Sequence, residues 1–228
     1  MRPGRWSRAG FLGPTERVHD VIERDARAVL ALGVTHAQIA GALDRLLDGA
    51  SSAYEPRIAR AARRAHEQML IAGTQMLDGE AVLDLEPSLD DIVRLLDRGE
   101  LPLEGQGAMI DGLQVFLKVY LGYQSCPWTM LRHPYCAAEP PCPMQVSCVK
   151  SVRMLSPVIG ATLPCTGGVT FRHGDRDFLI IDRGRRSYLR GSGLLPHLIR
   201  EHRFFEGEHS PYRLDPARAA RLLGLTGS

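Results

Sequence analysis

The chain has 228 residues, of which 44% are apolar and 24% charged, a composition typical of globular rather than disordered proteins. Its formal net charge of +2 is too small to indicate a nucleic-acid or membrane partner without a local basic patch. Neither a run of about 18 apolar residues nor an apolar segment after the arginine-containing start MRPGRW is present, so no membrane span and no secretory signal is expected. These features predict a cytoplasmic protein, and the excess of arginine over lysine suits a GC-rich bacterial genome.

Two helices are predicted at the start of the ordered chain. Apolar residues recur at helical spacing across Thr15–Leu32, and Gly33 is suited to end that helix. Thr35 and Gln38 have the spacing of a capping box, in which each side chain accepts a hydrogen bond from the other residue's backbone N–H. The second helix should therefore begin there, and we expect it to end at Gly49.

Further helices and a hairpin are expected before residue 100. Ser51 and Ser52 predict a break, followed by a third helix over Glu55–Ala72. Asp78-Gly79 is a tight-turn sequence that could join two short strands. Ser88 could cap a fourth helix that stops at Gly99.

The run Ala108–Leu121 fits two periodicities. Seven apolar residues match a helix that Gly122 would end, whereas Val115, Leu117 and Val119 match one face of a strand. Because the helical pattern has more matches, we predict a helix.

After Tyr123 the periodicity is lost, and prolines and cysteines dominate as far as Pro164. Beyond this segment, Gly168–Arg172 and Asp177–Asp182 are predicted to pair as a hairpin, with Ser187–Arg190 as a third strand. Two helices should follow, at Leu194–Phe205 and at Ala217–Leu223, the second capped by Asp215-Pro216.

These elements predict an α+β fold, in which a helical N-terminal part is followed by a Cys/Pro-rich irregular segment and a small antiparallel sheet with two C-terminal helices. The expected division is a flexible arm over 1–13, a mostly helical domain over 14–122, the Cys/Pro-rich segment over 123–165 and a small α/β part over 166–228. The irregular segment would pack between the other two parts or against the C-terminal one.

All five cysteines lie between positions 126 and 165. An odd number of cysteines without a secretory signal argues against a disulfide framework. Within this stretch, four residues are spaced H-x2-C-x5-C-x5-C, namely His133, Cys136, Cys142 and Cys148. Three cysteines and one histidine can supply the four donors of tetrahedral zinc, which would also order a segment that lacks hydrophobic periodicity. The simpler interpretation is that they are buried free thiols, because the paired C-x2-C units of most zinc knuckles are missing.

An enzyme with a cysteine nucleophile, or with a catalytic metal held in the same segment, is the first alternative. Cys126 and Cys165 are the weak candidates, the latter because Gly167-Gly168 follows it and could offer backbone N–H groups to an oxyanion. Either thiol would need a base, which His197 or His202 could provide if the fold brings them near. These two histidines are five residues apart, about 140° around a helix, so they are not expected to share a face.

A winged-helix DNA-binding protein is the second alternative. Three helices and a hairpin occur in the appropriate order, and four arginines of the third helix could contact phosphates, namely Arg57, Arg60, Arg63 and Arg64. Against this interpretation, the second helix is long, and the third has few side chains suited to reading base edges.

A basic stretch over 182–186, of sequence DRGRR, could hold an anion, although a solvated turn is the default interpretation. Taken together, the sequence favours a binding or accessory protein with a structural zinc site and a protein or peptide partner. The enzyme ranks second and the DNA-binding regulator third.

Overall fold

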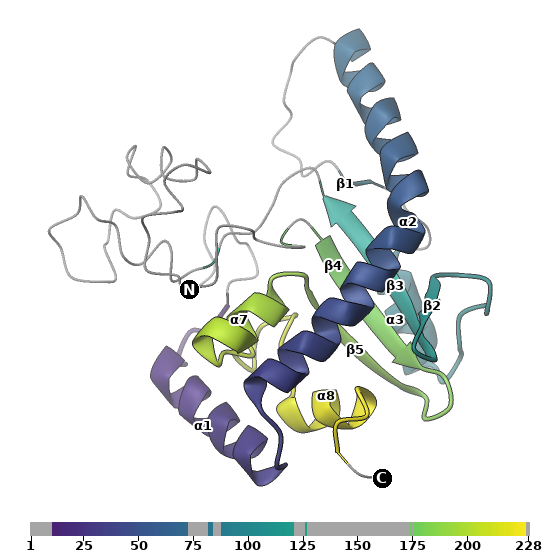
Figure 1. Ribbon diagram of the computed structural model, residues 1–228. Coiled ribbons are helices and arrows are strands. Elements are labelled where there is room, and N and C mark those ends of the chain that lie inside the picture. The colour runs from purple at the N-terminus through teal and green to yellow at the C-terminus, as the bar shows by residue number, and fades with distance from the viewer. Residues whose placement is uncertain are drawn as a thin grey trace, which may run out of the picture.

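The computed structural model describes residues 11–72, 82–83, 88–120, 126, 174 and 176–226, with the backbone alone described at 57–72. The predicted α+β class is confirmed. An antiparallel sheet has the strand order β1-β3-β4-β5, and β2 pairs with β3 along the same edge as β1 (Figure 1). The helices are α1 (Val18–Ala31), α2 (His36–Ala72), α3 (Leu89–Asp97), α7 (Leu195–His202) and α8 (Pro216–Leu222). The strands are β1 (Val82–Leu83), β2 (Ala108–Ile110), β3 (Leu113–Tyr120), β4 (Arg176–Asp182) and β5 (Ser187–Ser192).

The predicted start of α2 is confirmed in detail. The Thr35 N–H donates to Gln38 Oε1 at 2.8 Å, and the Gln38 N–H donates to Thr35 Oγ1 at 3.2 Å, which is the reciprocal pattern of a capping box. Just before it, Gly33 has a φ of +67°, as expected of a residue that ends α1.

The predicted end of this helix at Gly49 and the break at Ser51 and Ser52 were wrong, because α2 runs without interruption from His36 to Ala72. The Ser51 hydroxyl donates to the Leu47 carbonyl at 2.5 Å, and that of Ser52 donates to Asp48 at 3.0 Å, so both serines bond to the helix they were expected to interrupt. Gly49 has a packing role, since a Cβ there would lie 3.0 Å from Ile110 Cγ2. Glycine therefore lets α2 approach β2 closely.

The predicted helix over Ala108–Leu121 was also wrong, because β2 and β3 form a hairpin there. Asp111 and Gly112 have φ values of +50° and +78°, the backbone of the tight turns that join two antiparallel strands. The alternating residues Val115, Leu117 and Val119 all face the main core, as the strand pattern predicted. The Asp-Gly turn predicts this hairpin better than the larger number of apolar residues at helical spacing predicts a helix.

The sheet is covered on both faces. On one face, α2, α7 and α8 pack on β3, β4 and β5, and this cluster includes Leu43, Leu47, Phe178, Ile180 and Ile199. On the other face, α3, which is the predicted fourth helix, packs against β3 and β4, and this smaller cluster includes Leu89, Ile92, Phe116, Leu179 and Ile181. Helices from both halves of the chain thus share one sheet (Figure 1).

The C-terminal strands β4 and β5 lie where Asp177–Asp182 and Ser187–Arg190 were predicted. The expected hairpin partner of β4, Gly168–Arg172, lies outside the described residues, and β4 pairs with β3 on one edge and β5 on the other. Gly191 lies opposite Phe178, and a Cβ on it would fall 2.6 Å from the end of that ring. Glycine at this position therefore makes room for a core phenylalanine.

Both predicted C-terminal helices are present, and the predicted cap of the second is confirmed. Pro196 occupies the first turn of α7, where its missing N–H costs no hydrogen bond. The Asp215 side chain accepts from the Arg218 N–H at 2.7 Å at the start of α8, and Gly224, with a φ of +67°, follows its end.

The end of the expected N-terminal arm is packed rather than loose. Phe11 and Leu12 are buried beside α1 and α7, and the Phe11 carbonyl accepts from the Gly207 N–H at 2.8 Å. The earlier residues, 1–10, lie outside the described ranges.

Within the described ranges, no single helix combines the length and hydropathy of a membrane span. Only α1 taken together with His36–Pro56 meets that criterion, and these two segments bend by 89° relative to one another.

Candidate metal centre

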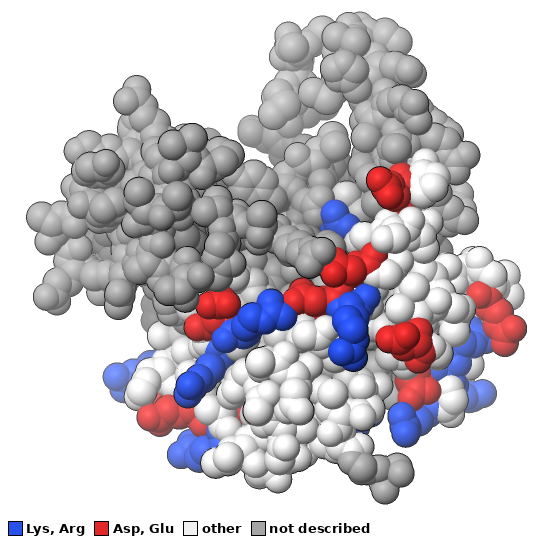
Figure 2. All heavy atoms as spheres, viewed as in Figure 1, with Lys and Arg blue, Asp and Glu red and all other residues white. Residues whose placement is uncertain are grey.

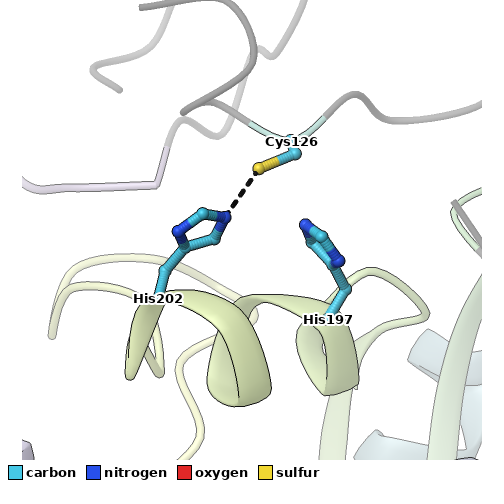
Figure 3. A group of neighbouring side chains, drawn as sticks. All are labelled: Cys126, His197 and His202. Carbon is cyan, nitrogen blue, oxygen red and sulfur yellow. Dashed lines mark hydrogen bonds between the residues drawn. The ribbon is translucent and has the colours of Figure 1, made fainter. Parts of the chain in front are cut away.

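Cys126 meets two histidines of α7 (Figure 3). Its Sγ lies 3.2 Å from Nε2 of His202, and the rings of His197 and His202 are 5.4 Å apart between centroids, in an edge-to-face arrangement. One potential ligand atom from each of the three residues lies within 4.8 Å of the other two. Cys126 is buried and both histidines are half-buried, so the group lies at the edge of the apolar interior.

The packing of α7 explains why the two histidines converge. They are separated by about 140° around the helix, and Leu194 and Leu198 fall between them on the helix surface. These leucines are fully buried in the same cluster as Cys126, so the face between the histidines is the one turned toward the thiol. Each imidazole reaches over one side of that face, as Figure 3 shows.

The end of α7 fixes the position of His202. It is the last helical residue, and Arg203 takes the left-handed conformation with a φ of +55°. The Arg203 N–H still donates to the Ile199 carbonyl at 3.1 Å, after which Phe204 and Phe205 enter the two apolar clusters. Two buried phenylalanines therefore anchor the helix end that carries the histidine.

This arrangement has the chemistry of a metal centre. A thiolate and two neutral imidazoles are the soft and borderline donors that zinc and copper prefer. Donors bound at about 2.0 to 2.3 Å in tetrahedral geometry lie about 3.5 Å from one another. The 3.2 Å separation between Cys126 Sγ and His202 Nε2 is already close to that value. The group formed by Cys126, His197 and His202 could hold a metal ion.

Sequence reasoning named all three residues of this group, but only as a nucleophile and its bases. The proposed ligands His133, Cys136, Cys142 and Cys148, and the second thiol candidate Cys165, lie outside the described residues. The two histidines were not expected to share a face of the helix, and they do lie about 140° apart around α7, but the face between them packs toward Cys126 and brings both within reach of the thiol. Their common target is a cysteine 76 positions before His202, a relation that no local spacing encodes.

The four arginines proposed to contact nucleic acid lie in the second half of α2, where the structure describes the backbone but not the side chains. A helix-turn-helix requires two helices joined by a turn at about residue 51, and α2 is continuous there. Figure 2 shows positive and negative side chains interspersed over the described part of the visible face, rather than gathered into a basic stripe.

Sequence reasoning missed a buried polar network that lies beyond α7. Glu206 is 1% exposed and accepts a hydrogen bond from the Ser210 hydroxyl, while Tyr212 donates to the buried Asp177 at 2.9 Å. Burial raises the pKa of Glu206 to about 8, outweighing the opposing effect of the Ser210 hydrogen bond. Glutamate at this position is therefore held in its protonated, neutral form near pH 7.

The same segment is tied to α1 by a bidentate ion pair. Arg213 donates to both carboxylate oxygens of Asp25, at 2.5 and 2.7 Å, and also to the Glu206 carbonyl at 2.8 Å. Asp25 is 1% exposed, and Arg24 also donates to its carboxylate at 3.3 Å, so the buried acid has two arginine partners. The carboxylate and the Arg213 guanidinium come from positions 188 residues apart, which explains why no local pattern predicts the pair.

No family model, no curated protein and no solved structure matches this chain. What the protein does is therefore inferred from its own geometry and chemistry. Within the described residues, the group of Cys126 with two histidines is the arrangement with the most specific chemistry.

Proposed function

We propose that the protein is a zinc-binding protein in which Cys126, His197 and His202 hold a structural ion, and that it acts as a binding or accessory protein. The observation that carries this proposal is the convergence of one sulfur and two imidazoles on a single point at α7. Zinc fits this donor set because it binds thiolate and imidazole together and favours four-coordinate geometry. A cytoplasmic location, where thiols stay reduced, would keep the sulfur available as a ligand.

A structural role fits the surroundings of the sulfur better than a catalytic one. Cys126 has no exposed surface and packs with Leu194, Leu198 and Phe204. A catalytic zinc has three protein ligands and one position open to water or substrate, whereas a structural zinc has four, so a structural role requires one donor beyond these three. Binding at this group would fasten the chain at Cys126 to α7, which itself packs on α2 and the sheet. The free energy of metal binding would then add to the stability of the fold.

A cysteine nucleophile is the second candidate, and the 3.2 Å contact between Cys126 and His202 favours it. A thiol this close to an imidazole can transfer its proton and become a reactive thiolate. The complete burial of Cys126 opposes this role, because a nucleophile must reach its substrate. Zinc binding and nucleophilic reactivity lead to opposite expectations for alkylation, so one experiment separates them.

The test is elemental analysis of purified, untagged protein after zinc loading and removal of free metal, followed by iodoacetamide labelling with peptide mapping. We expect Cys126→Ser and His202→Ala each to lower the bound zinc by about one ion per chain. We also expect the metal to protect Cys126 from alkylation, and chelation to remove that protection.

His19→Ala is the matched control, since His19 is an exposed histidine on α1 that pairs with Glu23. It should leave the zinc content unchanged. Equal zinc content in the wild type and in both site variants would refute the proposal. Rapid alkylation of Cys126 in protein shown to lack metal would instead support the nucleophile.

A further inference from the structure

A cavity that is open to solvent on one side lies away from the metal centre, between α8 and the turn that joins β4 to β5. Its volume is about 390 Å³, within the range of sites that bind small molecules. It is lined by Arg185, Ser187, Asp215, Arg218, Arg221 and Leu222. In Figure 1 this region is where α8 lies beside β5, at the C-terminal end of the chain.

Positive charge dominates the wall of this cavity. Three guanidiniums face one carboxylate, and that carboxylate, of Asp215, already accepts the Arg218 backbone N–H at 2.7 Å. Arg218 and Arg221 form no ion pair with any residue in the described ranges, while Arg185 pairs with Asp182 at 3.0 Å. The lining therefore carries three guanidiniums and one carboxylate, and neither Arg218 nor Arg221 forms an ion pair with that carboxylate.

The side chains are also positioned by their neighbours. The Arg218 guanidinium lies 4.7 Å from the centre of the Tyr188 ring, and the Tyr188 hydroxyl donates to Asp97 at 3.1 Å. Stacking on an aromatic ring fixes the plane of a guanidinium and leaves its N–H edge directed outward. Arg221 follows Arg218 by three residues, which places both on one side of α8.

We propose that this cavity binds a small molecule that carries a phosphate group. Arginine is suited to phosphate because its planar fork can donate two parallel hydrogen bonds to the oxygens. The ligand would be held by side chains rather than by the end of α8, since Asp215 already accepts the Arg218 N–H there. The cavity is larger than a bare phosphate needs, and Leu222 supplies an apolar wall for the body of the ligand.

Calorimetric titration of the full-length protein with inorganic pyrophosphate, at fixed ionic strength, tests this site. Pyrophosphate is the probe because it can engage more than one guanidinium. We expect saturable binding of one ion per chain, weakened about tenfold by Arg218→Ala and about tenfold by Arg221→Ala, because each removes charge-assisted hydrogen bonds. Lysine at both positions keeps the charge but loses the fork, so it should restore only part of the affinity.

Arg94→Ala is the matched control, because it removes an exposed arginine of α3 that pairs with Asp91. It should leave pyrophosphate binding unchanged, and circular dichroism verifies that each variant is folded. The absence of saturable binding at millimolar pyrophosphate would overturn the proposal, as would equal weakening by the control variant. Equal affinity for citrate would overturn the assignment to phosphate in particular.

Discussion

The packing of α2 on the sheet and the packing around α7 depend on different kinds of interaction. Between α2 and the sheet, nearly every buried side chain is apolar, and burial alone accounts for the arrangement. Around α7 and the segment after it, the interior also takes in a thiol beside two imidazoles, a neutral glutamic acid and a bidentate ion pair. Groups of this kind are costly to bury without partners. The comparison indicates that specific polar contacts organise the region around α7. The reactive side chains are concentrated in the same region.

The largest effect is expected in the sheet core. Phe178→Ala removes a fully buried ring that packs opposite Gly191, and we expect the free energy of unfolding to fall by about 3 to 5 kcal/mol. Chemical denaturation measures the change. Met109→Ala is the control, because Met109 is 52% exposed and its truncation should cost little. A loss below about 1 kcal/mol for Phe178→Ala would show that the core is not packed as described.

The buried glutamic acid should make stability depend on pH. The folded chain keeps a proton on Glu206 up to a pKa of about 8, while the unfolded chain releases it near the ordinary value of 4.5. The contribution of this group to stability is therefore fully present below that lower value and falls by about 1.4 kcal/mol per pH unit up to about pH 8. Glu206→Gln imitates the protonated acid, so its advantage over wild type should grow across this window and reach roughly 3 kcal/mol at pH 7.

Denaturation at a series of pH values tests this expectation. Glu208→Gln is the matched control, because Glu208 is exposed, with 61% of its side chain accessible, and should show no such pH dependence. A Glu206→Gln variant that is less stable than wild type throughout the window would mean that the glutamate is ionised in the fold.

Zinc binding should stabilise the folded protein through α7, and it should add the same free energy whether or not the sheet core carries a mutation. At a free zinc concentration 100 times the dissociation constant, binding to the folded state alone adds about 2.7 kcal/mol. We expect this gain in the wild type and in Phe178→Ala, but not in Cys126→Ser. Thermal denaturation with and without zinc measures it. If Cys126→Ser kept the zinc-dependent gain in stability, the metal would have to bind somewhere other than at Cys126 and α7.

The smallest effect concerns the start of α2. Thr35→Ala removes one half of the capping box, and we expect a loss of about 1 kcal/mol. Thr35→Ser keeps the hydroxyl and should retain most of that stability, as judged by the same denaturation measurement. Equal stability of the alanine and serine variants would show that the cap contributes nothing.

The two regions also differ in how far the sequence predicts them. The capping box, the helix α3 before Gly99 and the Asp215 cap were predicted correctly, because each depends on residues a few positions apart. The break at Ser51 and Ser52 failed since a serine hydroxyl can satisfy its own helix as well as interrupt it. The helix expected over Ala108–Leu121 failed because apolar matches were given more weight than the Asp111-Gly112 turn.

The candidate site could be predicted only as a set of separate residues. Cys126 and the histidines of α7 were each singled out, but their meeting depends on packing between segments more than 70 positions apart in sequence. The ion pair of Asp25 with Arg213 and the arginine-lined cavity beside α8 depend on similarly long-range packing. Local patterns do not contain this information.

X-ray absorption at the zinc edge of the zinc-loaded wild type tests whether the ion lies between Cys126 and α7. We expect two imidazole nitrogens at about 2.0 Å and one sulfur at about 2.3 Å from the metal. A site with three sulfurs and a single imidazole would contradict the proposed ligand set and indicate ligands elsewhere in the chain.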